Sequence, residues 1–545
     1  MIQRRLSLFL LLACVLAALL LMRVRQDHTP ISAPLPAGPI VYRDTAQAPT
    51  SPDADSRARA DATRQLRPNL KRLLGRRDAR PREAVLTFKD DEAYRRFLDR
   101  AQKLGLTVHG QLDALRTIRI SYASLAALEN DLLQNGIDYA DVTANFYVHI
   151  PEPPAKADRA AANEVPLRNN TLAFLGATGD RSTWGRGTTI AVLDSGVAPD
   201  PTFGAGRVQY LNVGAGTLPG SGPEDGHGTA VASLAAGLAA DAPGVAPAAS
   251  VLSIRVTGTD GTGDIFTVAQ AILAAVDAGA PLINISLGGY QTTALLDAAI
   301  GYATSRGALI VAAAGNDQAT QLTWPAADPR VISVGAVDAT GQQVTFSNSG
   351  PQLQITAPGY GVQTAWLDSQ RVYVDGTSAS APLVAGAIAA VMSQNPGFTA
   401  AQAWAVVQQT VSDAGTPGPD PDYGKGILNL DWALNYNNPA HIDPAVSALY
   451  YDSANSQMEF IVQNRSMQTV SGLRLDVDTS GFTTPYQLPD IAAGASYVVK
   501  VPVDQKTLSA AGSLIFTADL VTPFGLLDAV PANNHRTSRL MAPGP

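Results

Sequence analysis

The chain has 545 residues, which is long enough for several domains. Its hydrophobic fraction of 46% and charged fraction of 16% are typical of a globular protein with a large core. A net charge of −8 argues against a nucleic-acid-binding surface, and a single cysteine, Cys14, excludes disulfides and cysteine metal sites within the chain.

The N-terminal residues 1–25 are expected to direct export. An apolar run covers residues 6–22, and pairs of arginines precede and follow it. A charged segment followed by an apolar one is typical of a signal peptide. The run is also close to the shortest length that spans a bilayer. The main alternatives are a cleaved signal peptide of a secreted protein and an uncleaved anchor that tethers the protein to a membrane or cell envelope. A lipoprotein site at Cys14 and a buried core helix are further alternatives.

Residues 26–82 predict a disordered linker. Pro, Ala, Asp and Arg dominate this stretch, and it shows no steady hydrophobic periodicity. Its second half, from Arg57 to Arg82, is basic. We expect a solvated tether there, with contact to anionic lipid as the alternative.

Residues 83–151 alternate predicted strands and helices. Strands are expected at Glu83–Phe88, near Leu106–Gly110, at Thr117–Tyr122 and at Val142–Ile150. One helix is expected at Asp91–Leu104 and a second after Ser124, which is a suitable N-cap. The order β-α-β-β-α-β is typical of a ferredoxin-like α+β domain.

Residues 165–438 predict the largest domain, after a Pro- and Ala-rich linker at 152–164. Short apolar runs alternate here with helices of small residues. The runs are Thr189–Leu193, Val251–Val256, Leu282–Leu287, Ala308–Ala313 and Val331–Val337. Continuous apolar runs suit strands that are buried on both faces. Helices between them favour a doubly wound α/β domain with a parallel sheet.

Residues 439–545 predict an all-β domain. Strand-like runs are separated by turns, as in an immunoglobulin-like sandwich. The runs are Met458–Val462, Leu473–Val477, Tyr497–Val503 and Leu514–Leu520. The segments Ile491–Ser496 and Asn533–Arg536 resemble parts of adhesion-type sandwich modules.

Three polar residues of the α/β domain lie in short motifs at the edge of the predicted sheet. Asp194 ends an apolar strand, His227 opens a helix in Asp-Gly-His-Gly-Thr, and Ser378 precedes a helix in Asp-Gly-Thr-Ser-Ala. A serine hydroxyl becomes a nucleophile when a histidine takes its proton, and an acid behind the histidine fixes its tautomer. These residue types therefore predict a catalytic triad.

A fourth motif, Val311-Ala-Ala-Ala-Gly-Asn316, ends a strand with an amide side chain. In identity, order and spacing the four motifs resemble those of the subtilisin-like serine proteases, the subtilases, over about residues 165–435. The resemblance implies a serine endopeptidase that forms an acyl-enzyme on Ser378. It also implies that Asn316 and the backbone N–H of Ser378 stabilise the oxyanion.

The same resemblance implies the substrate contacts. Ser286, Leu287 and Gly288, together with the region 255–263, would form two edges that enclose an extended peptide. The first specificity pocket would have Ala312, Ala313 and Gly315 in its walls, Thr323 near its base and Asp317 at its rim.

In this family, a domain like residues 83–151 is an inhibitory prodomain whose tail lies in the active site. The tail here would be Asn145–Pro151, and self-cleavage of the zymogen is expected between Tyr147 and Glu164. Val165 resembles the start of the mature domain. The implied partners are protein or peptide substrates and the protein's own prodomain, and a monomer is expected.

No cofactor is implied for catalysis. The family often has a second histidine where this chain has Ala230, and many relatives bind calcium in the stretch that corresponds to Ala230–Val245, which is short and poor in carboxylates here. Calcium could bind elsewhere, with Asp260 and Asp264 among the candidate ligands.

Two other functions are compatible with the sequence. One is a pseudoprotease that binds peptides without cutting them. The other is a surface adhesin whose C-terminal sandwich carries the function, with the protease domain serving its maturation.

Overall fold

The structure is a computed structural model that describes residues 70–153, 164–213, 225–258 and 260–542. The predicted export segment 1–25 and most of the predicted linkers, residues 26–69 and 154–163, lie outside the described residues. Among the residues that are described, no helix is long and apolar enough to cross a membrane.

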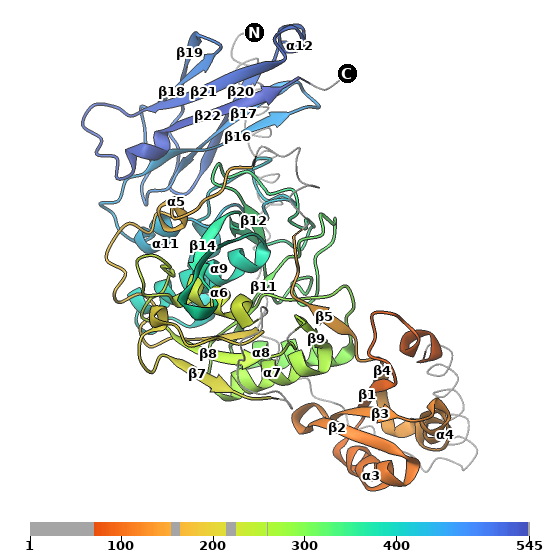
Figure 1. Ribbon diagram of the computed structural model, residues 1–545. Coiled ribbons are helices and arrows are strands. Elements are labelled where there is room, and N and C mark those ends of the chain that lie inside the picture. Colours follow the sequence, from red (N-terminus) through yellow and green to blue (C-terminus); the bar gives the residue numbers. More distant parts are fainter. Residues whose placement is uncertain (1–69, 154–163, 214–224, 259, 543–545) are drawn as a thin grey trace, which may run out of the picture. The chain divides into compact units, whose positions relative to one another are not determined.

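A seven-stranded sheet forms the centre of residues 165–438, the central domain (Figure 1). Its strand order is β13-β12-β11-β10-β6-β8-β7, and every neighbouring pair is parallel. The strands are β6 Thr189–Asp194, β7 Val208–Leu211, β8 Ser250–Arg255, β10 Leu282–Ile285, β11 Leu309–Ala313, β12 Ile332–Val337 and β13 Ile355–Pro358. The predicted parallel α/β architecture is confirmed.

Helices cover both faces of this sheet. Alternate residues of β6 point into different layers: Ala191 and Leu193 pack with α7 and α8, whereas Ile190 and Val192 pack with α6 and α9. Polar side chains can therefore reach solvent only at the strand ends. The other elements of the domain are α5 Thr171–Phe174, α6 Asp225–Ala236, β9 Thr262–Asp264, α7 Ile265–Asp277, α8 Ala294–Ser305, β14 Val362–Ala365, β15 Arg371–Val374, α9 Thr377–Gln394, α10 Ala400–Gln409 and α11 Leu430–Asn435.

The N-terminal domain, residues 70–151, contains a four-stranded antiparallel sheet of order β2-β3-β1-β4 with two helices. Its elements are β1 Glu83–Phe88, α3 Asp91–Ala101, β2 Leu106–Leu112, β3 Thr117–Tyr122, α4 Leu125–Asn135, β4 Tyr139–Thr143 and β5 Tyr147–His149. Ser124 caps α4, as its position suggested, and Asp90 caps α3. Phe88, Phe97 and Tyr139 pack their rings together in the core.

Two boundary predictions for this region are wrong. The linker was expected to reach residue 82, but residues 70–74 are helical, and Leu70 and Leu74 are buried in the core of the domain. In addition, the expected strand Val142–Ile150 is two strands. β4 pairs with β1, whereas β5 pairs with β9 of the central domain.

The C-terminal domain, residues 439–542, consists of two antiparallel sheets of order β16-β17-β20 and β19-β18-β21-β22. Phe460 from the first sheet meets Phe516 from the second, with ring centroids 6.3 Å apart. The elements are β16 Pro444–Asp452, β17 Gln457–Asn464, β18 Arg474–Thr479, β19 Phe482–Gln487, β20 Ser496–Pro502, α12 Gln505–Ala511, β21 Ser513–Val521 and β22 His535–Met541.

Candidate active site

Asp194 and His227 form a hydrogen-bonded pair at the carboxyl end of β6. The Nδ1 atom of His227 lies 2.7 Å from Oδ1 of Asp194, which is fully buried. The same carboxylate oxygen accepts the backbone N–H of Ser195 at 2.7 Å. Because Nδ1 faces the acid, Nε2 is the ring atom that remains for proton transfer in the adjoining cavity.

The backbone of α6 approaches the chain after β6 very closely at Gly228. A Cβ atom at this position would lie 2.1 Å from the carbonyl oxygen of Gly196. The N–H of Gly228 also donates to the hydroxyl of Ser195 at 3.1 Å. The absence of a side chain therefore allows the start of α6 to bring His227 within reach of Asp194.

Ser378 lies at the first turn of α9 and lines the same cavity as His227. The cavity has a volume of about 610 Å³. The hydroxyl of Ser378 donates to the carbonyl of Ser286 at 3.2 Å, and the Ser286 hydroxyl donates to the Ser378 carbonyl at 3.2 Å. The fold thus brings the three predicted residues together, with the serine rotated toward Ser286.

Asn316 follows β11 and has a fixed amide orientation. Its Oδ1 accepts hydrogen bonds from the backbone N–H and the hydroxyl of Thr377, both at 2.9 Å. Its Nδ2, on the other side of the amide, donates to the carbonyl of Pro151 at 2.7 Å. Thr377 was not singled out from the sequence, although it stands next to Ser378 in the same motif.

The segment 147–151 lies between the two edges that the sequence identified. β5 pairs with β9 in antiparallel register, so that Val148 lies opposite Gly263. On the other side, His149 and Gly288 exchange two backbone hydrogen bonds of 2.9 Å each. The N-terminal domain thus supplies the middle strand of a three-stranded arrangement, in the manner of a peptide bound by strand addition.

The residues predicted for the first specificity pocket that lie around Thr323 are small and uncharged. The Thr323 hydroxyl donates to the carbonyls of Ala313 and Ala314 at 3.3 Å, and its Cγ2 would lie 2.9 Å from a Cβ atom at Gly315. Asp317 accepts a hydrogen bond from the Tyr290 hydroxyl at 2.5 Å. Burial, together with this carboxylate, raises the pKa of Tyr290 to about 12. The negative charge of Asp317 is therefore partly offset by the Tyr290 hydroxyl.

The two carboxylates that were considered as calcium ligands have other partners. Asp264 forms ion pairs with Arg80 at 3.0 Å and Arg119 at 3.5 Å and caps α7 through the N–H of Thr267. Asp260 accepts the N–H of Thr262 at 3.0 Å. Asp264 is thus occupied by two arginines of the N-terminal domain, a role that its sequence position did not reveal.

A serine and a histidine that line one cavity, with a buried acid bonded to the histidine and an amide donor on the substrate-like tail, are the arrangement of a serine hydrolase. The model of the subtilase family matches residues 185–426. Subtilisin BL of Lederbergia lenta is 36% identical over 262 residues, which are 47% of this chain and 94% of that protein. The thermostable alkaline protease of Halalkalibacterium halodurans is 35% identical over 253 residues, 46% of this chain and 68% of that protein.

The chain belongs to the subtilase family, and it is a serine endopeptidase. Among solved structures, the epidermin leader peptide processing serine protease of Staphylococcus aureus has a similar fold, with a TM-score of 0.55 and 22% identity. That similarity covers 65% of this chain and 98% of the other chain.

Replacement of Asn316 tests its predicted role at the oxyanion. Asn316→Ala is expected to lower kcat by about 10²–10³-fold with little change in KM, because the amide would act on the charge that develops in the transition state. Steady-state hydrolysis of a peptide substrate measures this effect, with Ser378→Ala as the inactive reference that a fluorophosphonate no longer labels. A loss of less than about threefold would show that Asn316 has only a structural role.

Proposed function

We propose that this endopeptidase is exported and processes itself, and that Asp194, His227 and Ser378 are its catalytic triad. In the proposed reaction His227 removes the proton of the Ser378 hydroxyl, whose oxygen attacks the carbonyl carbon of the scissile peptide bond. Asn316 Nδ2 and the N–H of Ser378 stabilise the oxyanion. His227 then protonates the leaving amine, and water releases the acyl group. The apolar run at residues 6–22 supports export.

The contact between Asn316 and Pro151 is the observation that carries the self-processing proposal. A carbonyl oxygen at 2.7 Å from the amide occupies the place where the oxyanion of a substrate would form. Ile150 also donates its N–H to the carbonyl of Gly261 at 3.2 Å, which continues the strand up to Pro151. The proposed scissile bond is therefore Pro151–Glu152, within the window that the sequence predicted.

We further propose that residues 70–151 are the inhibitory prodomain. At the first turn of α7, the N–H of Phe266 donates to the Asn145 side chain at 3.2 Å and the N–H of Ile265 to the Phe146 carbonyl at 3.0 Å. These backbone donors lack partners within the helix itself. Because the N-terminal domain supplies their acceptors, the contact supports a specific complex that would persist after the cut.

The proposed organisation is an export segment, a linker, the prodomain 70–151, a processing linker, the catalytic domain 165–438 and an immunoglobulin-like domain 439–545. The packing of two antiparallel sheets through Phe460 and Phe516 supports the last assignment. A binding function of this domain, as in an adhesin, stays a second and weaker hypothesis. Binding assays on variants of its exposed loops would test it.

Self-cleavage predicts a defined N-terminus. Wild-type protein is expected to begin at Glu152 or, after trimming, within residues 152–165, whereas Ser378→Ala keeps residues 70–151 attached. Intact-mass analysis and N-terminal sequencing of both proteins measure this difference. Full activity of an unprocessed wild type, or identical processing of Ser378→Ala without a helper protease, would contradict the proposal.

The ion pairs of Asp264 predict how strongly the cleaved prodomain is retained. Asp264→Asn preserves the cap of α7, because asparagine caps as well as aspartate, but it removes the charge that the central domain offers to Arg80 and Arg119 and leaves Arg119 paired with Glu83 of its own domain. After processing, the prodomain is expected to bind the Asp264→Asn catalytic chain at least tenfold more weakly, as measured by co-elution at increasing dilution. The control is Asp277→Asn, at the exposed far end of α7, which should retain wild-type binding. Equal retention in both variants would contradict the assigned interface.

The pocket near Thr323 predicts a preference for apolar residues on the acyl side of the cut bond. Its walls carry no charge, and Thr323 narrows the space available to large rings. Relative kcat/KM values for substrates with Ala, Pro, Phe or Lys at this position measure the preference. Thr323→Gly is expected to raise the value for Phe relative to Ala. A strict preference for Lys or Arg would contradict this account.

A further inference from the structure

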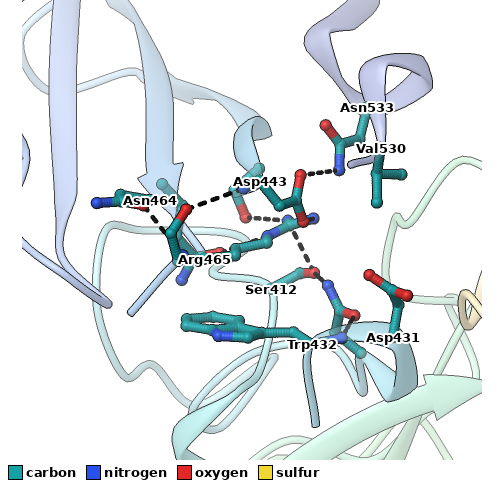
Figure 2. A network of polar contacts seen from close by, with 12 residues as sticks. Ser412, Asp431, Trp432, Asp443, Asn464, Arg465, Val530 and Asn533 are labelled. Carbon is teal, nitrogen blue, oxygen red and sulfur yellow. Dashed lines mark hydrogen bonds and ion pairs between the residues drawn. The ribbon is translucent and has the colours of Figure 1, made fainter. Parts of the chain in front are cut away.

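Three side chains of the kind that bind metals meet where the central domain passes into the C-terminal domain. Asp431 belongs to α11, and His441 and Asp443 lie on the segment that leads to β16. One ligand atom of each lies within 4.8 Å of the other two. His441 is 9% exposed and Asp443 is 1% exposed. Asp431 and Asp443 lie near the buried Arg465 (Figure 2).

Two of the ligand atoms are buried without a hydrogen bond. Nε2 of His441 and Oδ2 of Asp431 lie 3.1 Å apart, within ion-pair distance, but the contact does not have the geometry of a hydrogen bond, and neither atom accepts or donates one elsewhere. The two atoms are thus close together, but the ring nitrogen does not point at the carboxylate oxygen. Two ligands bound to one Zn²⁺ at about 2.0–2.2 Å in tetrahedral geometry would lie roughly 3.3–3.6 Å apart, each pointing at the metal. The observed pair resembles that arrangement.

The remaining carboxylate oxygens of both aspartates are held by amides. Asn435 Nδ2 donates to Oδ1 of Asp431 at 3.3 Å. Asn533 Nδ2 donates to Oδ1 of Asp443 at 2.8 Å (Figure 2). Hydrogen bonds of this kind to the outer oxygen of a carboxylate orient the inner oxygen of a metal ligand. They come from α11 and from the 3₁₀ turn before β22, so both domains help to shape the cluster.

The charges near His441 leave room for a divalent cation. Three carboxylates, Asp431, Asp443 and Asp528, lie near this histidine. Two guanidiniums, those of Arg465 and Arg536, line the same cavity as Asp431 and Asp443, and Nη1 of Arg465 lies 4.0 Å from Oδ2 of Asp443. Three carboxylates against two guanidiniums leave the surroundings of the cluster negative, which favours a bound cation.

We infer that Asp431, His441 and Asp443 bind a divalent transition-metal cation at the junction of the two domains. One imidazole nitrogen and two carboxylate oxygens form a donor set that suits Zn²⁺. The ion would join α11 to the start of β16 and so fasten the C-terminal domain to the central domain. Binding to the folded chain alone would also stabilise it by mass action.

Calorimetric titration with Zn²⁺ alone tests the site. The full chain carries Ser378→Ala to prevent autolysis and is first freed of metal with a chelator. We expect saturable binding of one Zn²⁺ per chain, weakened at least tenfold by His441→Gln and by Asp443→Asn. His109→Gln is the matched control, because His109 is an exposed histidine far from the cluster in sequence, and its loss should leave the affinity unchanged.

A second readout separates metal binding from misfolding. Circular dichroism should show that Asp443→Asn is folded, and Zn²⁺ should raise the Tm of the parent but not that of this variant. Absence of saturable binding to the folded parent, or binding that survives both His441→Gln and Asp443→Asn, would overturn the inference. Either result would leave an ion pair of protonated His441 with Asp431 as the role of the cluster.

Discussion

The orientation of one amide, that of Asn316, links the fold of this protein to its proposed chemistry. Its oxygen accepts two hydrogen bonds from Thr377 at the start of α9, and its nitrogen faces the Pro151 carbonyl. A flipped amide would place two donors against each other at the Thr377 N–H and two acceptors against each other at the Pro151 carbonyl. Thr377, which precedes Ser378, therefore fixes the orientation in which the Asn316 side chain donates its N–H.

The N-terminal and central domains satisfy each other's buried polar groups. Asp264 is 2% exposed and compensates Arg80 and Arg119, while Asn145 and Phe146 accept the N–H groups at the start of α7. If either domain left, these groups would need water or new partners, which is costly for buried charges and helix ends. The same contacts that present the tail to Asn316 would thus keep the cleaved prodomain in place as an inhibitor.

The features that were predicted best from the sequence are those that depend on the chemistry or burial of individual residues. The strands of the parallel sheet are buried on both faces, so their apolar runs predicted the strand bounds to within one or two residues. Ser124 was recognised as an N-cap because serine is one of the few residue types whose side chain caps a helix well. The proposed triad could be named because four short motifs resemble those of the subtilases in identity, order and spacing. The contact of Asp194 with His227, and the cavity that His227 and Ser378 share, are properties of the fold.

What the sequence could not predict depends on contacts between distant segments. The linker was extended too far because the helical residues 70–74 lie among arginines, and only packing shows that Leu70 and Leu74 are buried. The strands β19 and β22 were missed because β19 is mostly exposed and β22 alternates polar residues at a sheet edge. Likewise, the residues next to Asp264 in the sequence do not predict its ion pairs with Arg80 and Arg119, because both arginines belong to another domain.

The central claim is that the tail of the N-terminal domain lies in the cleft of its own chain, as the bond between Asn316 and Pro151 indicates. The dependence of the processing rate on protein concentration tests this claim most directly. For freshly refolded wild type, the account predicts a first-order rate that stays constant when the concentration is lowered a hundredfold. A rate that falls in proportion to concentration would mean that one molecule cuts another, and it would contradict the account.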